Sequence, residues 1–526
     1  MMSGGAVAGG REPRLVPDWL ARRARTHGGH PAVEAPSGTL AYGELEARVA
    51  AAARTLSGER TAPVAGAPVA VLAANDLPLC ILSHAVPRAG AVLMPINARL
   101  TPGEIAWQLL DSRTPLLLAD EEHRALAEAA LAEMAEPAPA GPPSPAPSVL
   151  AAEELAESAV AGAGGTPGSE PALDLDAVHS ALYTSGTSGR PKAALLTHGN
   201  LLASAVASAF HVGVRAEDRW LAPLPLYHVG GLSVLIRSTL AGTTAVVHRR
   251  FDEAAVSRAL REQGVTLTSL VPAMLGRLLD YDAGRPPYPA AVRAVLVGGA
   301  GAPAGLLGRA EERGLPVAPT YGLTEAASQV TTLAPGQARR RPRSSGQPLL
   351  GVSVAIDAGG RRAQPGEIGE ILVAGPTVSP GYLNRPAERR EGGWLRTGDL
   401  GALDADGHLE VADRRDDLVV SGGENVYPAE VEAALAAHPA VQECAVVGLP
   451  DERWGQVVVA AIVCPGPDVP AGSSLEAFLR GQLAGYKVPR RIEVWEGPLP
   501  RTASGKLLRR RVREGLTDRD RARPAR

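Results

Sequence analysis

A glycine-rich stretch at residues 180–192 holds the residues whose types and spacing are best suited to chemistry. Glycines let the backbone approach an anion closely, hydroxyl side chains donate hydrogen bonds, and a lysine supplies positive charge. The residues concerned are Thr184, Ser185, Gly186, Thr187, Ser188, Gly189 and Lys192. Their spacing is not that of a Walker phosphate loop. The composition alone predicts either a phosphate-binding loop or a flexible surface loop of small polar residues.

Two further strand-like segments end in polar turns downstream. Residues 293–297 and 316–319 are largely apolar, as expected of buried strands, and each runs into a turn. The turn residues are Gly299, Ala300 and Gly301 after the first segment, and Tyr321, Gly322, Thr324 and Glu325 after the second. The first turn nearly satisfies the dinucleotide-binding fingerprint. No acidic residue follows at a strand end about twenty positions later, so that match is weak.

A third segment presents a histidine and an arginine. Residues 220–232 predict a strand that ends in a turn with Tyr227 and His228, and residues 232–240 predict an apolar helix that contains Arg237. An unpaired buried guanidinium is costly. Arg237 therefore needs a partner, which is either a carboxylate of the protein or an anionic group of a substrate.

The composition is that of an ordinary globular protein. Of the 526 residues, 45% are hydrophobic and 21% are charged, and 53 basic against 56 acidic residues give a net charge of −3. This balance provides no electrostatic footprint for nucleic acid or for an anionic membrane. Three scattered cysteines suit a reducing compartment, and neither a signal peptide nor a membrane-spanning apolar run is recognised. We therefore expect a cytoplasmic protein that binds no nucleic acid and inserts into no membrane.

Alternating strand and helix signals predict an α/β fold. Strand-like residues 68–72 and 91–95 flank the helix-like residues 77–89, and the alternation recurs further along the chain. Asn200 is predicted to cap a helix over residues 201–210. Strands that alternate with helices imply mainly parallel sheets covered by helices.

Changes of composition and pattern predict the domain organisation. Residues 1–415 are expected to form a large N-terminal domain, in which residues 137–171, rich in Pro, Ala and Gly, are an insertion or linker. From about residue 347 to residue 415 short strands predict a small β-rich subdomain. Residues 416–526 predict a small α+β domain at the C-terminus.

Taken together, the polar motifs resemble those of the adenylate-forming superfamily, which contains acyl-CoA synthetases, adenylation domains and luciferases. The motifs that carry the resemblance, in the family's order and spacing, are residues 184–192, 321–325 and 397–399, Arg414 with Asp416 and Asp417, residues 422–425 leading to 430–432, and residues 500–506. The resemblance covers nearly the whole chain. It implies a large N-terminal domain followed by a small, mobile C-terminal domain.

The resemblance also implies an ATP-dependent reaction in two steps. A carboxylate attacks the α-phosphate of ATP to give acyl-AMP and pyrophosphate, and a thiol then displaces AMP. In the family, loops similar to residues 184–192 shield the β- and γ-phosphates of ATP. Thr324 resembles the ligand of the α-phosphate, and Glu325 resembles the carboxylate that binds Mg²⁺.

The nucleoside part of ATP has its own set of implied contacts. Residues 299–301 fit the strand-end turn that lines adenine, with Tyr321 against the base and Gly322 beside it, which replaces the dinucleotide interpretation. Asp399 is similar to the residue that accepts both ribose hydroxyls, and Arg414 would assist it. As an alternative, Asp399 could serve only to stabilise a turn.

The C-terminal domain supplies the remaining implied roles. Lys506 looks like the catalytic lysine that bridges the acyl carboxylate and the α-phosphate. Asp416 resembles the hinge residue about which the domain turns between the two steps, and Gly422 and Gly423 begin the loop that closes on CoA. The residues given catalytic roles by the resemblance are Lys506, Thr324, Glu325 and His228.

Within the family, two strings at residues 225–238 and 320–333 look like those of the ligases that act on 2-succinylbenzoate in menaquinone biosynthesis. That acid has two carboxylates, so the one that is not activated needs a cation, and Arg237 would supply it. Gly230 departs from the serine expected at its position in that subfamily.

The other residues implied for the acid side are His228 and Ser328. His228 resembles the residue that gates the acyl pocket, although a lone histidine could equally be a satisfied core residue. The implied partners are a small carboxylic acid, ATP and CoA, with Mg²⁺ as cofactor, and a homodimer is left open.

Three other functions compete with this interpretation. The first is a ligase for a medium-chain fatty acid or an aryl acid, and the second is a freestanding adenylation domain that loads a carrier protein. The third is a catalytically inactive nucleotide sensor, which the intact Glu325 and Lys506 disfavour.

Overall fold

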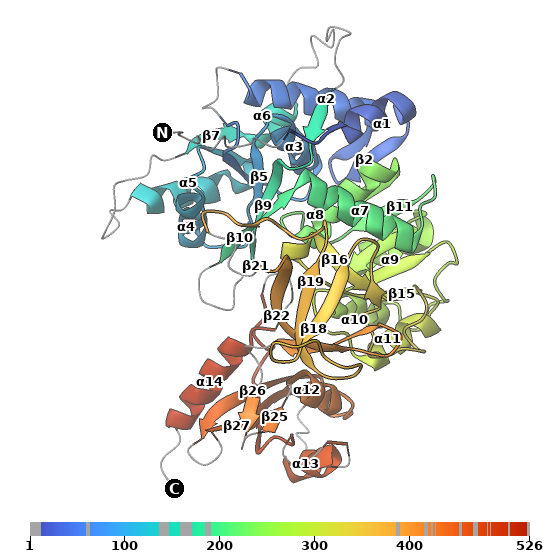
Figure 1. Ribbon diagram of the computed structural model, residues 1–526, viewed down its shortest axis with the longest axis vertical. Coiled ribbons are helices and arrows are strands. Elements are labelled where there is room, and N and C mark those ends of the chain that lie inside the picture. The colour runs from blue at the N-terminus through green and yellow to red at the C-terminus, as the bar shows by residue number, and fades with distance from the viewer. Residues whose placement is uncertain are drawn as a thin grey trace, which may run out of the picture. The chain divides into compact units, whose positions relative to one another are not determined.

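The computed structural model describes residues 12–58, 64–135, 147–157, 171–184, 191–385, 390–414 and 419–522, the last range with gaps at 422–423, 427, 452–454, 467–471, 481, 484, 486, 503–504 and 506. The chain divides into two compact units, and Figure 1 labels the elements of both. The first unit consists of residues 1–250, 324–328 and 376–388, and the second of residues 251–323, 329–375 and 389–526.

A seven-stranded sheet is the centre of the first unit. Its strands, in spatial order, are β20 (Gly381–Tyr382), β10 (Lys192–Thr197), β9 (Val178–Thr184), β5 (Val92–Pro95), β4 (Pro68–Leu72), β6 (Leu116–Ala119) and β7 (Ser148–Ala151). The strands from β9 to β7 are parallel, whereas β10 and β20 are antiparallel to their neighbours. The sheet therefore changes direction at β9, the strand that leads into the glycine-rich loop.

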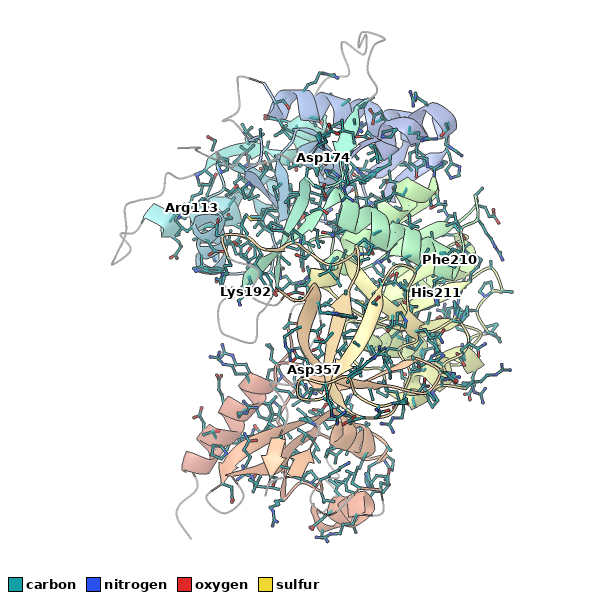
Figure 2. All side chains as sticks on the ribbon, viewed as in Figure 1. Arg113, Asp174, Lys192, Phe210, His211 and Asp357 are labelled. Carbon is teal, nitrogen blue, oxygen red and sulfur yellow. The ribbon has the colours of Figure 1, made fainter. Side chains whose placement is uncertain are left out.

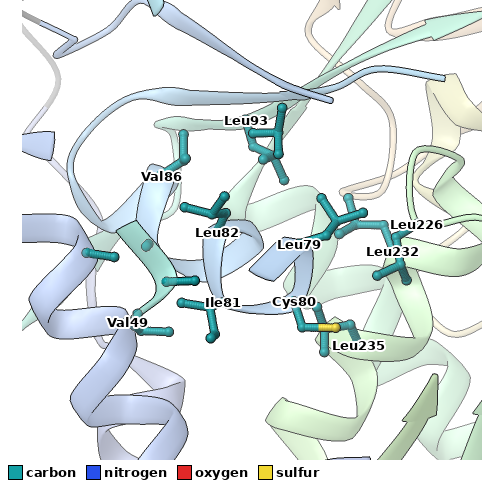
Figure 3. Packing of buried hydrophobic residues seen from close by; sticks show 14 of the residues in the cluster. Val49, Leu79, Cys80, Ile81, Leu82, Val86, Leu93, Leu226, Leu232 and Leu235 are labelled. Carbon is teal, nitrogen blue, oxygen red and sulfur yellow. The ribbon is translucent and has the colours of Figure 1, made fainter. Parts of the chain in front are cut away.

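Helices cover both faces of this sheet because successive residues of its buried strands point to opposite sides. In β4, Val69 and Val71 pack into one core cluster, and Ala70 and Leu72 pack into another. The helices of the first unit are α1 (Trp19–His27), α2 (Tyr42–Leu56), α3 (Leu77–Arg88), α4 (Pro102–Ser112), α5 (Arg124–Ala135), α6 (Ala152–Ala156), α7 (His198–Val212) and α8 (Val229–Ala241). Figure 3 shows the larger cluster, in which residues of α2, α3 and α8 meet.

The first unit holds further strands outside the seven-stranded sheet. They are β1 (Leu15–Pro17), β8 (Ala172–Asp174), β11 (Arg219–Ala222), β12 (Thr244–Val247), β2 (Pro31–Ala35) and β3 (Gly38–Ala41). Strands β11, β12 and β2 are parallel neighbours in that order, and β3 returns antiparallel to β2. Because α8 connects β11 to β12, it is a crossover helix packed on this part of the sheet.

Three buried histidines lie together at the base of the hairpin formed by β9 and β10. The rings of His179 in β9 and His198 in α7 meet edge to face at 5.1 Å, and His84 of α3 lines the same small cavity with Asp18 and Arg88. Burial lowers the pKa of His84 and of His198 to about 4 and holds the pKa of His179 well below its usual value. The three rings are therefore neutral at pH 7.

The second unit contains a mainly parallel sheet, a β-rich part and a C-terminal α+β part. The first of these comprises strands β13 (Leu267–Leu270), β14 (Ala294–Val297), β15 (Val317–Leu323), β16 (Ser328–Thr332) and β17 (Gln347–Pro348), with helices α9 (Glu253–Glu262), α10 (Pro272–Tyr281) and α11 (Ala304–Glu312). The β-rich part comprises β18 (Ser353–Asp357), β19 (Gly369–Ala374), β21 (Arg390–Glu391), β22 (Trp394–Leu403) and β23 (Leu409–Arg414).

The C-terminal part of the second unit is one sheet between helices. It comprises β24 (Val419–Ser421), β25 (Glu424–Val426), β26 (Glu443–Asp451), β27 (Gly455–Val463) and β28 (Arg491–Val494), with α12 (Pro428–Ala436), α13 (Gly472–Arg480) and α14 (Arg509–Ala522). Val446 of β26 packs with residues of α12 and α13, whereas its neighbours Ala445 and Val447 pack with residues of α14. The predicted α/β class, with helix-covered and mainly parallel sheets, is confirmed.

Two local predictions were wrong. Asn200 is not the helix cap: the hydroxyl of Thr197 accepts from the Asn200 backbone N–H at 3.1 Å and caps α7, while the Asn200 side chain accepts in return from the Thr197 N–H at 2.9 Å. The segment predicted as a linker also contains β7 and α6. Ala152, Leu155 and Ala156 lie in the core cluster of the first unit, because this short Ala-rich helix can pack closely against α2 and α3.

None of the helices in the described part of the chain is both long enough and apolar enough to cross a membrane.

Acidification is expected to destabilise the protein between pH 6.5 and about 4. An unfolded histidine binds its proton near pH 6.5, whereas the folded His84 and His198 do so only near pH 4. The unfolded chain therefore binds more protons in this window, and the free energy of unfolding falls as the pH falls. Urea unfolding at a series of pH values measures how steeply the free energy of unfolding depends on pH. His179→Asn should make this dependence less steep, whereas the control His27→Asn, on the exposed end of α1, should leave it unchanged. Equal pH dependence in the wild type and both variants would contradict the account.

Candidate active site

The two ends of the glycine-rich loop are held together by the β9–β10 hairpin. Thr184 lies opposite Lys192, and the Thr184 hydroxyl donates to the Lys192 carbonyl at 3.3 Å. Figure 2 labels Lys192, which begins β10. The other predicted loop residues, Ser185, Gly186, Thr187, Ser188 and Gly189, lie outside the described residues.

Glu325 lies half-buried in a short 3₁₀ helix, η2 (Thr324–Ala326), directly after Thr324. The Tyr382 hydroxyl donates to Glu325 Oε1 at 2.7 Å, and the Ser379 N–H donates to the Glu325 backbone carbonyl at 2.8 Å. Within the described residues, Glu325 Oε2 accepts no hydrogen bond. A carboxylate held by one oxygen with the other oxygen free is a fitting ligand for Mg²⁺.

The residues after Glu325 form a strained turn. Ala327 and Ser328 have φ values of 52° and 93°, in the left-handed region that residues with a Cβ rarely adopt. The Ser204 hydroxyl of α7 donates to the Ala327 carbonyl at 2.6 Å and so holds the turn in this conformation. Backbone strain of this kind is concentrated at functional sites, and here it sets the position of the predicted substrate residue Ser328.

His228 is the residue that precedes the first turn of α8. Its ring meets the Tyr227 ring edge to face at 4.6 Å. Burial and, to a smaller extent, the charge of Arg99 lower the pKa of His228 to about 4. The His228 Nε2 atom is buried and has no hydrogen-bond partner among the described residues. His228 is therefore a neutral ring with an unused nitrogen, which is not the satisfied core histidine of the alternative interpretation.

Close contacts hold the chain that precedes α8. The Asn75 side-chain amide donates to the Leu224 carbonyl at 3.0 Å and accepts from the Leu226 N–H at 3.0 Å. A Cβ on Gly231 would lie 2.2 Å from the Pro225 carbonyl oxygen, so only glycine allows this approach. A Cβ on Gly230 would meet only a Leu224 methyl group, at 3.3 Å.

The other end of α8 is held by side chains from α1 and α2. The buried Tyr42 hydroxyl donates to the carbonyls of Ser238 and Thr243, at 2.9 and 2.7 Å. The Arg23 guanidinium donates to the Leu240 carbonyl. The Ser238 carbonyl also accepts from the backbone N–H groups of Gly242 and Thr243. The last carbonyls of a helix lack partners within it, so Arg23 pairs a Leu240 carbonyl that the helix itself leaves without a donor.

Arg237 is buried in the third turn of α8, with only 5% of its surface exposed. Its guanidinium lies 5.5 Å from the centre of the Trp220 ring, and Nη2 donates to the Ser204 hydroxyl at 3.5 Å. No carboxylate forms an ion pair with Arg237 within the described residues, and its Nε has no partner there. Burial lowers the pKa of Arg237 to about 9. The described residues thus provide no carboxylate partner of the kind the sequence left open.

Further buried polar atoms in α7, α8 and β11 lack hydrogen-bond partners in the described part of the chain. They belong to Ser208, His211, Trp220 and Ser238. Ser208 and His211 share a face of α7 with Ser204, since residues four and seven positions apart lie on one side of a helix. Figure 2 labels His211 at the end of this helix. Buried polar groups are normally satisfied, so this group of donors and acceptors points to a polar ligand or to water.

The predicted nucleoside residues lie in the second unit. The Tyr321 hydroxyl donates to Asp399 Oδ2 at 2.8 Å, and both side chains are buried. Gly299, Ala300 and Gly301 follow β14, the parallel neighbour of the strand that carries Tyr321 and Gly322. Gly299 has a φ of 78°, which its lack of a Cβ permits.

The structure describes only the backbone of one further predicted site residue and leaves four others outside the described residues. The backbone of Arg414 lies opposite Asp399 in the ladder of β22 and β23. Asp416, Gly422, Gly423 and Lys506 lie outside the described residues.

Three residues near the site were missed from the sequence: Asn75, Ser204 and Tyr382. Each acts through a contact with a residue far along the chain, and none belongs to a polar motif of its own. The available signal was that Tyr382 follows Gly381, a residue typical of turns and strand ends. That signal does not identify Glu325 as its partner.

Comparison with known proteins identifies the family. Residues 20–383 match the family described as AMP-binding enzyme, and residues 430–506 match the AMP-binding enzyme C-terminal domain. A 2-succinylbenzoate–CoA ligase of Geobacillus kaustophilus (strain HTA426) is 40% identical over 509 residues, which cover 95% of this chain and 97% of that protein.

Solved structures of similar proteins support the same family. The o-succinylbenzoate CoA synthetase of Bacillus subtilis in complex with the acyl-adenylate intermediate OSB-AMP is 36% identical, with a TM-score of 0.84 and coverage of 95% of this chain and 98% of that one. The same enzyme in complex with ATP and magnesium ion is 36% identical, with a TM-score of 0.84 and coverage of 96% and 100%. The chain therefore belongs to the AMP-binding enzyme family, and the predicted resemblance to adenylate-forming enzymes is confirmed.

Gly231→Ala is expected to destabilise the protein by about 2 kcal/mol, because the new Cβ would collide with the Pro225 carbonyl and displace the start of α8. The matched control is Gly230→Ala, one residue earlier in the same turn. It should be neutral or slightly stabilising, since alanine favours a helix and only a methyl group must move. Urea unfolding measures both variants, and equal stabilities would refute the close contact.

Proposed function

We propose that this protein is a 2-succinylbenzoate–CoA ligase, an AMP-forming enzyme that joins 2-succinylbenzoate to CoA in menaquinone biosynthesis. The observation that carries the proposal is Arg237, a buried guanidinium with no ion-pair partner in the described part of the chain. A diacid retains one carboxylate after the other is activated. That carboxylate supplies the negative charge that the surroundings of Arg237 lack, and the names of the relatives support the same acid.

The reaction conserves atoms and charge in two displacements. A carboxylate oxygen of the acid attacks the α-phosphorus of ATP, and pyrophosphate leaves with the electrons of the broken bond. The CoA thiol then loses its proton and attacks the acyl carbonyl, and AMP leaves. Negative charge gathers at the α-phosphate in the first step and at the carbonyl oxygen in the second, so cations and N–H donors must be held in advance at both positions.

The ATP side of the proposal assigns the phosphates to the loop between Thr184 and Lys192, the α-phosphate to Thr324, and Mg²⁺ to Glu325. When bound with ATP, Mg²⁺ neutralises phosphate charge. Asp399 accepts the ribose hydroxyls, with the Tyr321 hydroxyl holding one of its oxygens. The residues assigned to adenine and its surroundings are Gly299, Ala300, Gly301, Gly322 and Arg414.

The acid side of the proposal uses three residues of the first unit. Arg237 neutralises the carboxylate that is not activated, His228 borders the acyl group as a neutral ring, and Ser328 contributes a hydroxyl from the strained turn. Gly230 contributes no hydroxyl group. The unpartnered hydroxyl of Ser208, one turn after Ser204 on α7, is a donor that supports recognition of an anion near Arg237.

The composition supports the roles of two lysines. Only three of the 53 basic residues are lysines, and two of them, Lys192 and Lys506, lie in the proposed phosphate and catalytic motifs. A compact ammonium group differs from a planar guanidinium in size and in the directions of its hydrogen bonds. In a chain that otherwise uses arginine, lysine at these two positions indicates that the reaction requires the ammonium group.

The C-terminal domain, residues 416–526, completes the proposed enzyme. Lys506 bridges the acyl carboxylate and the α-phosphate during the first step. The domain then turns about Asp416, so that Gly422 and Gly423 close on CoA for the second step. The enzyme works in the cytoplasm, where ATP and CoA are available.

Arg237→Met should lower kcat/KM for 2-succinylbenzoate about a hundredfold, because it removes the charge that pairs with the second carboxylate and keeps most of the apolar volume. Analogues that lack one of the two carboxylates should show which group is recognised. With the monoacid that lacks the recognised carboxylate, the variant should differ from the wild type by less than about threefold. The rate of pyrophosphate release measures kcat/KM for each acid.

The matched control is Arg219→Met. Arg219 is paired with Glu34 at 2.6 Å, so its loss should change the rates with the diacid and with the reactive monoacid in equal proportion. A similar loss for the diacid and the reactive monoacid in Arg237→Met would show that Arg237 is structural and would remove the basis for this acid.

Lys506→Ala is expected to slow acyl-AMP formation by roughly a hundredfold to a thousandfold, because the developing charge at the α-phosphate loses its cation. Transfer of a supplied acyl-AMP to CoA should slow far less, since that step takes place after the domain has turned. Pyrophosphate exchange measures the first step, and thioester formation from acyl-AMP measures the second. The control is Lys487→Ala, which removes the third lysine. Equal losses in the two steps would contradict the assigned role.

A further inference from the structure

Tyr382 lies in β20, the edge strand of the seven-stranded sheet, and its side chain contacts Glu325 of the short helix η2. It pairs with Ala194 in the ladder of β20 and β10, two residues beyond the end of the glycine-rich loop. Its ring is buried, and the Lys192 ammonium lies 5.5 Å from the ring centre. The same side chain therefore lies beside the cation that ends the loop and donates its hydroxyl hydrogen to Glu325.

The segment that carries Tyr382 is fixed before it reaches Glu325. The Asn200 amide of α7 donates to the carbonyls of Pro376 and Val378, at 2.8 and 3.1 Å. The Ser379 backbone N–H then donates to the Glu325 carbonyl. Glu325 is thus held by its backbone and by its carboxylate from one segment that is anchored on α7.

The hydrogen bond from Tyr382 makes the two oxygens of the Glu325 carboxylate different. Oε1 accepts from the phenol at 2.7 Å, and Oε2 accepts nothing from the described residues. A carboxylate that binds a metal ion is commonly held by a hydrogen bond to its other oxygen, which restricts its rotation and directs the free oxygen to the metal ion. Without the phenol, the carboxylate could turn and expose either oxygen.

We propose that Tyr382 is a positioning residue for magnesium: its hydroxyl fixes the Glu325 carboxylate so that Oε2 is presented to the Mg²⁺ that accompanies ATP. This inference rests on the proposed role of Glu325 as the magnesium ligand. It adds to that role a residue from a separate segment of the chain, and it assigns Tyr382 no contact with ATP or with the acid.

The test compares Tyr382→Phe with Tyr183→Phe in the full-length protein. Tyr183 is a matched control because its hydroxyl also donates to a carboxylate, that of Asp111, at 2.9 Å. Both variants keep the aromatic ring, and thermal unfolding establishes that both are folded. Calorimetry then measures the affinity for ATP with saturating Mg²⁺ and with a chelator in its place.

Tyr382→Phe should weaken the binding of magnesium-bound ATP about tenfold and leave the binding of metal-free ATP unchanged. The concentration of magnesium-bound ATP that gives half-maximal pyrophosphate exchange should rise by the same factor, and excess magnesium-bound ATP should restore the rate. Tyr183→Phe should change none of these quantities. An unchanged magnesium dependence in Tyr382→Phe, or an equal loss of affinity with and without the metal, would overturn the inference.

Glu325→Gln separates this inference from the function on which it rests. If Glu325→Gln weakens magnesium-dependent ATP binding and Tyr382→Phe does not, only the role of Tyr382 is wrong. If Glu325→Gln leaves magnesium dependence unchanged, Glu325 is not the ligand, and both assignments are overturned whatever Tyr382→Phe does.

Discussion

The buried guanidinium of Arg237 is a positive charge removed from water, and it has no acidic partner among the described residues. Transfer of a guanidinium to the interior costs several kcal/mol, and the lowered pKa of Arg237 expresses that cost. Helix α8 is held at both ends, by Asn75 and Gly231 before and within its first turn and by Tyr42 beyond its last. These contacts hold the helix in place, and an anion at the proposed acid site would offset the cost. A diacid substrate is one such anion.

Contacts of α7 connect this charge to the proposed phosphate side of the site. Ser204 accepts from Arg237 and donates to Ala327, which lies two residues beyond Glu325. Asn200, one turn earlier on α7, holds the segment that leads to Tyr382. The strained turn at residues 327–328 is therefore fixed by the same helix that contacts Arg237. An enzyme that joins an acid to the α-phosphate needs the two groups held in fixed positions, since a small displacement between them costs much of the rate.

The sequence was informative where chemistry or periodicity is local. Strand β4 and helix α3 follow from an apolar run and from apolar residues at helical spacing, and the Tyr321–Glu325 motif is contiguous. Residues 148–156 were misjudged because alanine suits a linker as well as a tightly packed helix. The roles of Ser204 and Tyr382 were out of reach, since each depends on a partner 123 or 57 positions away that only the fold brings near.

The central claim is that this enzyme activates a diacid and recognises the carboxylate it leaves unreacted. The most direct measurement is AMP release by the purified protein with ATP, Mg²⁺ and CoA across a panel of acids. The account predicts the highest kcat/KM for 2-succinylbenzoate, by about a hundredfold or more over medium-chain fatty acids and simple aryl acids. A higher kcat/KM for a fatty or an aryl monoacid would contradict it.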